Sequence, residues 1–256
     1  MDKHDPIAVF DSGLGGISVL RQLLRIMPQE NYIYFGDSLN APYGPRSKED
    51  VCRLTVKNVD FLLQKKAKAI VLACNTATAA ACKILRSNNP DIPIIGIEPA
   101  IKPAVTGKKG GRILVMATAM TLSASKFAKL LAAYKDQAQL LLLPAPGIVE
   151  LVEAGITSGS QLDDYLDQLL APYRYPPIDG IVLGCTHFPL VQDSIIRSLG
   201  YPAAIFDGAE GTARETKRQL AARGWLNGCS KKGQVEFCNS NPDPALNELC
   251  LKLLNS

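Results

Sequence analysis

One apolar run occurs twice in this sequence, and each copy ends in a cysteine. IVLACNT at residues 70–76 returns 111 positions later as IVLGCTH at residues 181–187. Its continuous apolar character is typical of a strand buried on both faces of a parallel sheet. A single reactive thiol would need only one copy. The repeat therefore predicts two similar units, each of which supplies one cysteine.

A second, weaker repeat supports the same division of the chain into two similar units. IAVFDS at residues 7–12 is matched by ILVMAT at residues 113–118, an offset of 106. Around both repeats, apolar runs alternate with helical patterns, which predicts α/β domains with doubly wound, mostly parallel sheets. The expected strands lie at 7–11, 31–37, 69–74, 92–99, 112–118, 138–145, 178–185 and 201–207. The helical patterns include 16–27, 47–66 and 122–134.

The boundary between the units is marked by the glycine-rich, charged segment TGKKGG, after which the series of strands starts again. The tail carries an expected helix at 211–224, a strand at 233–239 and a last helix at 244–254, and we expect it to return to the first unit. We therefore predict a first domain of residues 1–98 plus 208–256 and a second domain of residues 99–207.

The composition excludes several classes of protein. Hydrophobic residues make up 47% of the chain and charged residues 20%, with a scattered net charge of +4, so we expect no nucleic-acid partner. No apolar run reaches the roughly 18–20 residues that cross a bilayer, so we expect no membrane partner. The N-terminus lacks the apolar segment of a secretory signal. The seven cysteines show no metal-ligand spacing, which favours reduced thiols, a cytoplasmic location and no metal.

Polar and reactive residues follow the expected strands. Ligands of open parallel sheets bind outside the carboxyl ends of the strands. Those ends carry Asp11, Ser12, Asp37, Tyr43, Gly44, Cys74, Asn75, Thr76, Cys185, Thr186 and His187. The stretch DSGLGG is similar to a dinucleotide fingerprint, but Ser18 stands at the last glycine position. The free backbone N–H groups at a helix start of this kind can bind a carboxylate as well as a phosphate.

Cys74 and Cys185 differ from the other cysteines, which we interpret as inert small apolar residues. Each ends an apolar strand and precedes a helix start, where N–H donors stabilise a thiolate and lower its pKa. A drop from about 8.5 to about 7 needs roughly 2 kcal/mol, which a helix end can supply. His187 follows Cys185 by two residues, so a Cys–His hydrolase is an alternative.

Two thiols that face each other across a cleft suit the inversion of a stereocentre. One residue removes the α-proton as a thiolate, and the other returns a proton from the opposite face as a thiol. The reverse reaction exchanges the roles. Two similar domains would place one thiol on each face of the planar intermediate, which explains why the chain carries two copies.

At these residues the sequence resembles the glutamate racemases, cofactor-independent enzymes of the aspartate/glutamate racemase superfamily. The matching segments are FDSGLGGISVL (10–20), YFGDSLNAPYG (34–44), ACNTATA (73–79), PIIGIEPA (93–100) and LGCTHFPL (183–190). The resemblance implies two flavodoxin-like domains related by a pseudo-two-fold axis, with the active site in the cleft between them. It implies interconversion of L- and D-glutamate without a cofactor, D-glutamate for bacterial peptidoglycan synthesis, and a homodimer.

The resemblance also implies roles by motif position. Cys74 would act on the α-proton of D-glutamate with help from Asp11, and Cys185 on that of L-glutamate with help from His187. Glu153, in IVELVEAG, matches a family glutamate near Cys185. The residues implied to hold the substrate are Asp11, Ser12, Tyr43, Gly44, Asn75, Thr76, Thr118, Thr121, Thr186 and His187. Ala145 and Phe188 depart from the family pattern, which often has cysteine and tyrosine there.

Three other interpretations stay open: a racemase for aspartate or another acidic amino acid, a hydrolase that uses Cys185 and His187, and a two-lobed binding protein without catalysis. The α-proton of an amino acid is very weakly acidic, and the sequence contains no evident electron sink. A racemase of this kind has to stabilise a carbanion with N–H and hydroxyl donors aimed at the α-carboxylate.

Overall fold

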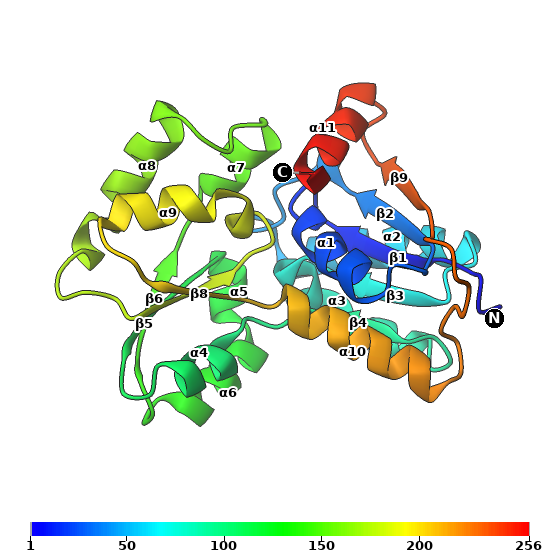
Figure 1. Cartoon of the computed structure of the whole chain (residues 1–256), viewed down its shortest axis with the longest axis horizontal. Helices are drawn as coiled ribbons and strands as arrows, with labels where there is room; N and C mark the ends of the chain where they lie inside the picture. Colours follow the sequence, from blue (N-terminus) through cyan, green and yellow to red (C-terminus); the bar gives the residue numbers. More distant parts are fainter. Residues whose placement is uncertain (1, 256) are drawn as a thin grey trace.

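The computed structural model describes residues 2–255, which form two β-sheets flanked by helices (Figure 1). The five-stranded sheet has the order β4-β3-β1-β2-β9, and the four-stranded sheet has the order β6-β5-β7-β8. Neighbouring strands run parallel throughout. The predicted α/β architecture with parallel sheets is therefore confirmed. We call each sheet with its helices a lobe.

Every predicted strand is present, and most are shorter than the apolar run that predicted them. The strands of the first lobe are β1 (Ile7–Asp11), β2 (Tyr32–Gly36), β3 (Ala69–Leu72), β4 (Ile94–Gly96) and β9 (Val235–Asn239). Those of the second lobe are β5 (Arg112–Ala117), β6 (Gln139–Pro144), β7 (Gly180–Gly184) and β8 (Ala204–Asp207).

Helices cover both faces of each sheet. The first lobe has α1 (Ile17–Ile26), α2 (Lys48–Gln64), α3 (Asn75–Asn88), α10 (Ala209–Ala222) and α11 (Pro244–Asn255). The second has α4 (Ile101–Gly107), α5 (Ala119–Ser123), α6 (Ser125–Tyr134), α7 (Ile148–Glu153), α8 (Ser160–Leu170) and α9 (Gln192–Leu199). The single helix predicted at 122–134 is divided at Ala124, whose backbone is extended. Within residues 2–255, none of these helices has the length and apolar character needed to span a membrane.

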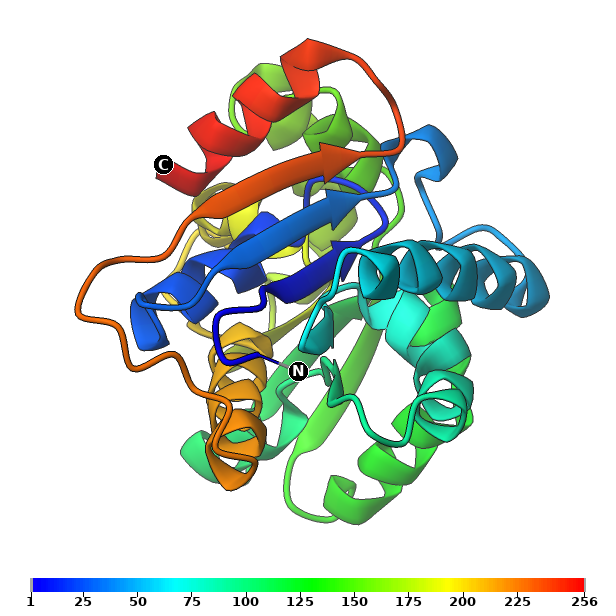
Figure 2. The ribbon, with the colours of Figure 1, turned by 90° about the vertical axis from the view of Figure 1, so that its right-hand side faces the viewer.

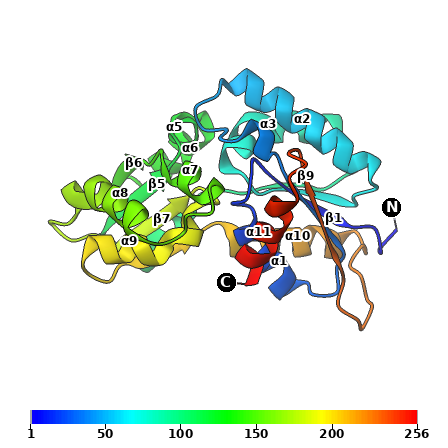
Figure 3. The ribbon, with the colours of Figure 1, turned by 90° about the horizontal axis from the view of Figure 1, so that it is seen from above.

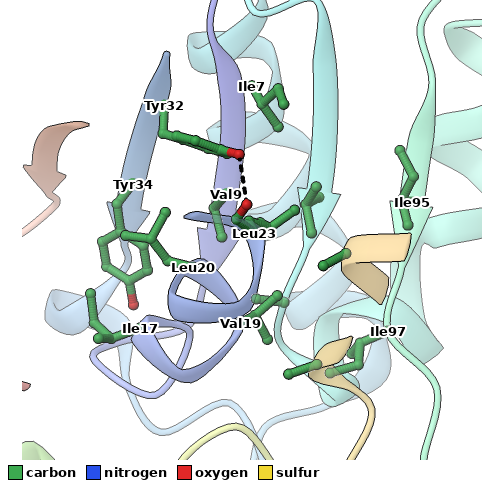
Figure 4. Packing of buried hydrophobic residues seen from close by; sticks show 14 of the residues in the cluster. Ile7, Val9, Ile17, Val19, Leu20, Leu23, Tyr32, Tyr34, Ile95 and Ile97 are labelled. Atoms are coloured by element: carbon green, nitrogen blue, oxygen red, sulfur yellow. Dashed lines mark hydrogen bonds between the residues drawn. The ribbon is translucent and has the colours of Figure 1, made fainter. Parts of the chain in front are cut away.

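The core of the first lobe follows the two-residue period of its strands. Ile7 and Val9 of β1 pack with α1, α10 and α11, whereas Ala8 and Phe10 belong to the cluster with α2 and α3. Figure 4 shows the first cluster, in which the Tyr32 hydroxyl donates a hydrogen bond of 3.1 Å to the Leu23 carbonyl at the end of α1. This packing on both faces explains why the strands read as continuous apolar runs.

The two sheets repeat one topology in one register. The order β4-β3-β1-β2 of the first lobe corresponds to β8-β7-β5-β6 of the second. Ile7 lies opposite Ala69, and Ile113 lies opposite Gly180, which are the counterparts of those residues at offsets of 106 and 111. The sequence repeats therefore correspond to strands that pair in the same way in both lobes.

The tail adds a strand that only the first lobe has. β9 pairs in parallel with β2 at the edge of the five-stranded sheet, and α11 follows it (Figure 2). α11 then packs on α1, and its Cys250 and Leu253 are buried in the same cluster as β1. The tail thus lies against the first sheet, as the sequence pattern predicts.

The chain passes between the lobes twice, from β4 into α4 and from β8 into α10. The two connections touch each other. A Cβ atom added to Gly208 would lie 2.4 Å from the Glu98 carbonyl oxygen, so only glycine allows this approach.

A buried ion pair lies near the amino ends of the first-lobe strands, away from their carboxyl ends. Lys68, directly before β3, is 0% exposed and its Nζ lies 2.6 Å from Oε2 of Glu30, which is 2% exposed. The ammonium also donates to the carbonyl oxygens of Lys3 and Trp225. The pair thereby joins the N-terminal segment, the α1–β2 connection and the tail.

Candidate active site

A cavity of about 250 Å³ lies where strand ends of both lobes meet. This volume is just below the range of about 300–1,000 Å³ that is usual for drug-sized ligands, so the cavity suits a small metabolite. Most of the predicted site residues line it: Ser12, Tyr43, Gly44, Cys74, Asn75, Thr76, Thr118, Cys185, Thr186 and His187. Asp11, Glu153 and Thr121 do not line it, but contact residues that do.

The two cysteines reach this cavity from equivalent places in the two sheets. Cys74 follows β3 and forms the N-cap of α3, and Cys185 follows β7, the counterpart of β3. Both side chains line the same cavity, with 5% and 7% of their surface exposed. One thiol from each lobe is therefore accessible to the same small molecule.

Burial dominates the environment of Cys74. It raises the pKa of this thiol to about 12, and the nearby Asp11 carboxylate adds to the shift. The Ala77 backbone N–H donates to Sγ at 3.4 Å and Ser12 also contributes a hydrogen bond, but together they do not offset the loss of water. The N–H of Ala77 at the helix start lowers the pKa of Cys74, as predicted, but burial outweighs it, so the predicted net drop in pKa is wrong for Cys74.

His187 connects Cys185 to a carboxylate. Its Nδ1 lies 3.7 Å from Cys185 Sγ, and its Nε2 lies 2.6 Å from Glu153 Oε1. Burial alone lowers the pKa of the imidazole, but its hydrogen bonds to Cys185 and Glu153 outweigh burial and raise the pKa well above its ordinary value. The imidazole can therefore carry a proton at neutral pH beside the sulfur of Cys185.

Glu153 is held in place from the other lobe. The backbone N–H of Leu14, in the turn between β1 and α1, donates to Glu153 Oε1 at 2.7 Å. Gly13 lies so close that an added Cβ atom would be 2.0 Å from the same oxygen. The glycine-rich turn thus fits around this carboxylate, and Glu153 contacts His187 from behind the cavity.

Asp11 lies behind the cavity on the Cys74 side. It is fully buried at the end of β1, and burial raises the pKa of its carboxyl group above the ordinary value. Its carboxylate accepts hydrogen bonds from the Gly13 N–H at 3.2 Å and from Thr186 Oγ1 at 3.0 Å. Asp11 therefore contacts both the turn that follows β1 and the segment that carries Cys185.

Three threonines form a second link between the lobes. Thr76 Oγ1 and Thr118 Oγ1 lie 3.0 Å apart, and Thr118 donates to Thr121 Oγ1 at 3.0 Å. Gly44 packs against Thr118, since an added Cβ atom would lie 3.2 Å from its methyl group. Thr121 thus orients Thr118 from behind, whereas Thr76 and Thr118 line the cavity.

Two polar side chains of the cavity wall, Asn75 and Tyr43, differ in whether their polar atoms already have a hydrogen-bond partner. Among the described residues, Asn75 Oδ1 is buried without a hydrogen-bond partner, so it can accept a bond from a ligand. The Tyr43 hydroxyl, in contrast, donates to Asp37 Oδ2 at 2.5 Å, and Asn58 of α2 donates to the same oxygen at 3.0 Å. Tyr43 therefore offers the cavity its ring and backbone.

The sequence patterns missed part of the wall. Further lining residues are Pro42, Pro45, Ala119, Pro144, Ala145, Pro146, Val149 and Glu150. The prolines beside Tyr43 and Ala145 gave a signal, because loops at strand ends form ligand sites. Asn58, which contacts Asp37 behind Tyr43 and does not line the cavity, gave no signal, since it sits within an amphipathic helix. Within the described part of the chain, no three His, Cys, Asp or Glu side chains are grouped as metal ligands.

Comparison with known proteins yields a consistent set of relatives. The family model for Asp/Glu/hydantoin racemase matches residues 9–216. The glutamate racemase of Clostridium novyi is 49% identical, with 92% of this chain and 91% of that protein covered. A glutamate racemase isoform of Bacillus anthracis has a similar crystal structure, with a TM-score of 0.88, 32% identity and coverage of 99% and 95%. Escherichia coli glutamate racemase in complex with L-glutamate gives a TM-score of 0.84, 30% identity and coverage of 98% and 94%.

Proposed function

This chain belongs to the Asp/Glu/hydantoin racemase family, and from that premise we propose that it interconverts L-glutamate and D-glutamate. It is an isomerase that moves a proton at the α-carbon and supplies D-glutamate for peptidoglycan biosynthesis. The single observation that carries the proposal is the cavity into which each lobe contributes one cysteine, Cys74 and Cys185.

The proton transfer uses the two thiols as a pair. With L-glutamate, the Cys185 thiolate takes the α-proton and the C–H electron pair stays on the substrate, while the Cys74 thiol gives its proton to the opposite face. D-glutamate leaves with the thiol and thiolate exchanged, and the reverse reaction begins from that state. His187 carries a proton beside Cys185 with support from Glu153, and Asp11 serves the Cys74 side.

Hydrogen-bond donors hold the substrate. The lining residues that the structure describes include no Lys or Arg, so the carboxylates depend on hydroxyl, amide and backbone N–H groups. We assign this task to Ser12, Tyr43, Gly44, Asn75, Thr76, Thr118 and Thr186, with Thr121 acting through Thr118. Such fixed donors stabilise negative charge on the α-carboxylate as the carbanion forms. The L-glutamate held by the Escherichia coli relative supports this choice of substrate.

Incubation of the purified protein with L-glutamate in heavy water tests the proposal. We expect D-glutamate with deuterium at the α-carbon, resolved by chiral chromatography with mass detection. Parallel incubations with L-aspartate identify a racemase for another acidic amino acid. Unchanged L-glutamate without deuterium would contradict the proposal.

A second function has one observation in its favour. The Cys185–His187–Glu153 arrangement has the order of a nucleophile, a base and an orienting carboxylate. A hydrolase of this kind does not use Cys74. Hydrolysis of an activated ester that survives Cys74→Ala, together with the absence of racemisation in the wild type, would favour it.

We further propose that the protein works in the cytoplasm as a homodimer. All seven cysteines are free, which suits a reducing compartment. We divide the chain into a first domain of residues 1–98 plus 208–256 and a second of residues 99–207. The two separate sheets support this division, since β9 of the tail pairs with β2.

A further inference from the structure

The carboxyl ends of three neighbouring strands of the first lobe lie beside one side chain of the second lobe. β1, β2 and β9 are adjacent and parallel, so their carboxyl ends lie at the same edge of the sheet. Glu153, the last residue of α7, reaches this edge across the boundary between the lobes. Figure 3 shows α7 on the second lobe and β9 on the first, on either side of that boundary. Each of the three strand ends can therefore supply a group that holds the Glu153 carboxylate.

The two oxygens of the Glu153 carboxylate have different partners. Oε1 accepts the N–H of Leu14, in the turn after β1, and pairs with His187 Nε2. Oε2 lies 3.5 Å from the hydroxyl of Ser38, which begins the short 3-10 helix η1 (Ser38–Asn40) after β2. Hydrogen bonds of this length in active sites often tighten when substrate binds. Ser38 therefore holds the oxygen that does not pair with His187.

Asn239, the last residue of β9, sets the direction of the Ser38 hydroxyl. Its Nδ2 donates to Ser38 Oγ at 3.0 Å, and its Oδ1 accepts the Asn241 N–H at 2.9 Å. The second bond fixes which way the amide points, because a backbone N–H can only donate. Since the amide donates to Ser38 Oγ, the hydroxyl hydrogen is directed away from Asn239 and toward Glu153 Oε2. The tail strand is thus linked to His187 through Asn239, Ser38 and Glu153.

We propose that Ser38 is a positioning residue for the Cys185 half of the reaction, and that Asn239 aligns the Ser38 hydroxyl for this task. The inference rests on the racemisation proposed above and adds two residues to its support. A carboxylate held at both oxygens keeps Oε1 of Glu153 on His187 Nε2. The imidazole is then held with its Nδ1 beside the sulfur of Cys185, at 3.7 Å.

Isotope effects test this role. In Ser38→Ala we expect kcat for glutamate racemisation to fall about tenfold, the order that loss of one hydrogen bond to a charged group produces. Proton removal at Cys185 then limits the rate more than proton removal at Cys74 does. The deuterium isotope effect on kcat/KM should therefore rise for α-deuterated L-glutamate and fall for α-deuterated D-glutamate. Isotope effects that are unchanged in both directions would overturn the proposal.

Three further variants separate positioning from a general loosening of the loop. Ser38→Thr keeps the hydroxyl and should retain near-wild-type kcat and isotope effects. Asn239→Asp replaces the amide donor with an acceptor that competes for the Ser38 hydroxyl, so we expect the pattern of Ser38→Ala. Ser240→Ala is the matched control, because the Ser240 hydroxyl accepts the Leu39 N–H of the same loop and, in the described part of the chain, makes no bond to Glu153. A loss in Ser240→Ala equal to that in Ser38→Ala would contradict a specific role for Ser38.

A proton NMR signal tests the position of Glu153 without any turnover. The bond of 2.6 Å between His187 Nε2 and Glu153 Oε1 is short and buried, so its proton should resonate far downfield. In Ser38→Ala we expect this signal to move upfield, because the carboxylate loses its alignment with His187, whereas Ser240→Ala leaves it in place. A signal that stays or moves further downfield in Ser38→Ala would show that Glu153 keeps its position without Ser38. The signal does not depend on racemisation, so a failure of the proposed reaction is distinguished from a failure of Ser38 to hold Glu153.

Discussion

Thr186 Oγ1 donates a hydrogen bond to Asp11 Oδ1 across the boundary between the two lobes, at 3.0 Å. Thr186 is the neighbour of Cys185 in the sequence, and the Asp11 charge contributes to the raised pKa of Cys74. The environments of the two thiols are thus connected through one side-chain contact. Their protonation should be described for the pair and not for each sulfur alone.

Replacing either thiol by a hydroxyl tests the two-base mechanism. Cys74→Ser and Cys185→Ser keep the size of the side chain but remove the acidic sulfur, so we expect kcat for racemisation to fall by about 10²–10⁴-fold in each. In Cys185→Ser, Cys74 remains to exchange the α-proton of D-glutamate. Mass spectrometry in heavy water should then detect deuterated D-glutamate with little L-glutamate. Near-wild-type turnover of either variant in both directions would exclude the mechanism.

Glu153→Gln should lower the pKa of His187. The chain has two histidines, His4 and His187, so the imidazole signals in an NMR titration are simple to assign. The hydrogen bond that His187 donates to the Glu153 carboxylate helps to raise the His187 pKa, and the neutral amide cannot stabilise the imidazolium as a carboxylate does. We therefore expect His187 to lose its proton at a lower pH in the variant, while the His4 signal is unchanged. If His187 titrated at the same pH in the variant as in the wild type, Glu153 would not be what stabilises the protonated imidazole.

Gly15→Ala should disturb His187 and Thr186 together. A Cβ atom at Gly15 would lie 2.5 Å from His187 Nδ1 and 2.6 Å from Thr186 Oγ1, and both side chains are buried. We expect kcat to fall by about 10²-fold, because a shift near 1 Å at a catalytic group has that effect. Gly211→Ala in α10 is the matched control, since its added Cβ meets no atom within 4 Å. Steady-state racemisation kinetics compare the two, and an active Gly15→Ala enzyme would contradict the assigned geometry.

The sequence predicted those features that depend on short stretches of chain. The strands, the α/β class and the cysteines at the ends of β3 and β7 followed from apolar runs and from a repeat. The contact of Glu153 with His187 and Leu14 did not follow, because it depends on how two lobes pack. The pKa of Cys74 was mispredicted for a related reason. A helix start is visible in a sequence, whereas the burial that outweighs it arises only when the chain folds around the sulfur.

Lys68→Met should destabilise the protein without affecting the reaction. The variant leaves the Glu30 carboxylate buried without its cation, so we expect the free energy of unfolding to fall by about 3–5 kcal/mol. Urea denaturation measures this change. The control is Lys65→Met, whose pair with Glu236 is exposed to solvent and should contribute less than about 1 kcal/mol. Equal losses of unfolding free energy in the two variants would show that burial of the Lys68–Glu30 pair does not add to its contribution to stability.

Lys68 precedes β3 and Cys74 follows it, so the ion pair and the cavity lie at opposite ends of one strand. The Lys68→Met protein should therefore turn over glutamate at the wild-type rate at temperatures where it stays folded. A reduced kcat in fully folded protein would mean that the pair influences the cavity through β3.

The contact between the two connections at Glu98 and Gly208 has a mechanical consequence. Two lobes joined by a single connecting segment can rotate in any direction. Two adjacent connecting segments resist twisting and leave one easy rotation, about the line that passes through both segments. Opening and reclosing along that single path would return Thr76 to Thr118 and Thr186 to Asp11 in every cycle. A substrate could then enter and leave many times while the two sulfur atoms recover the same spacing around each new α-carbon.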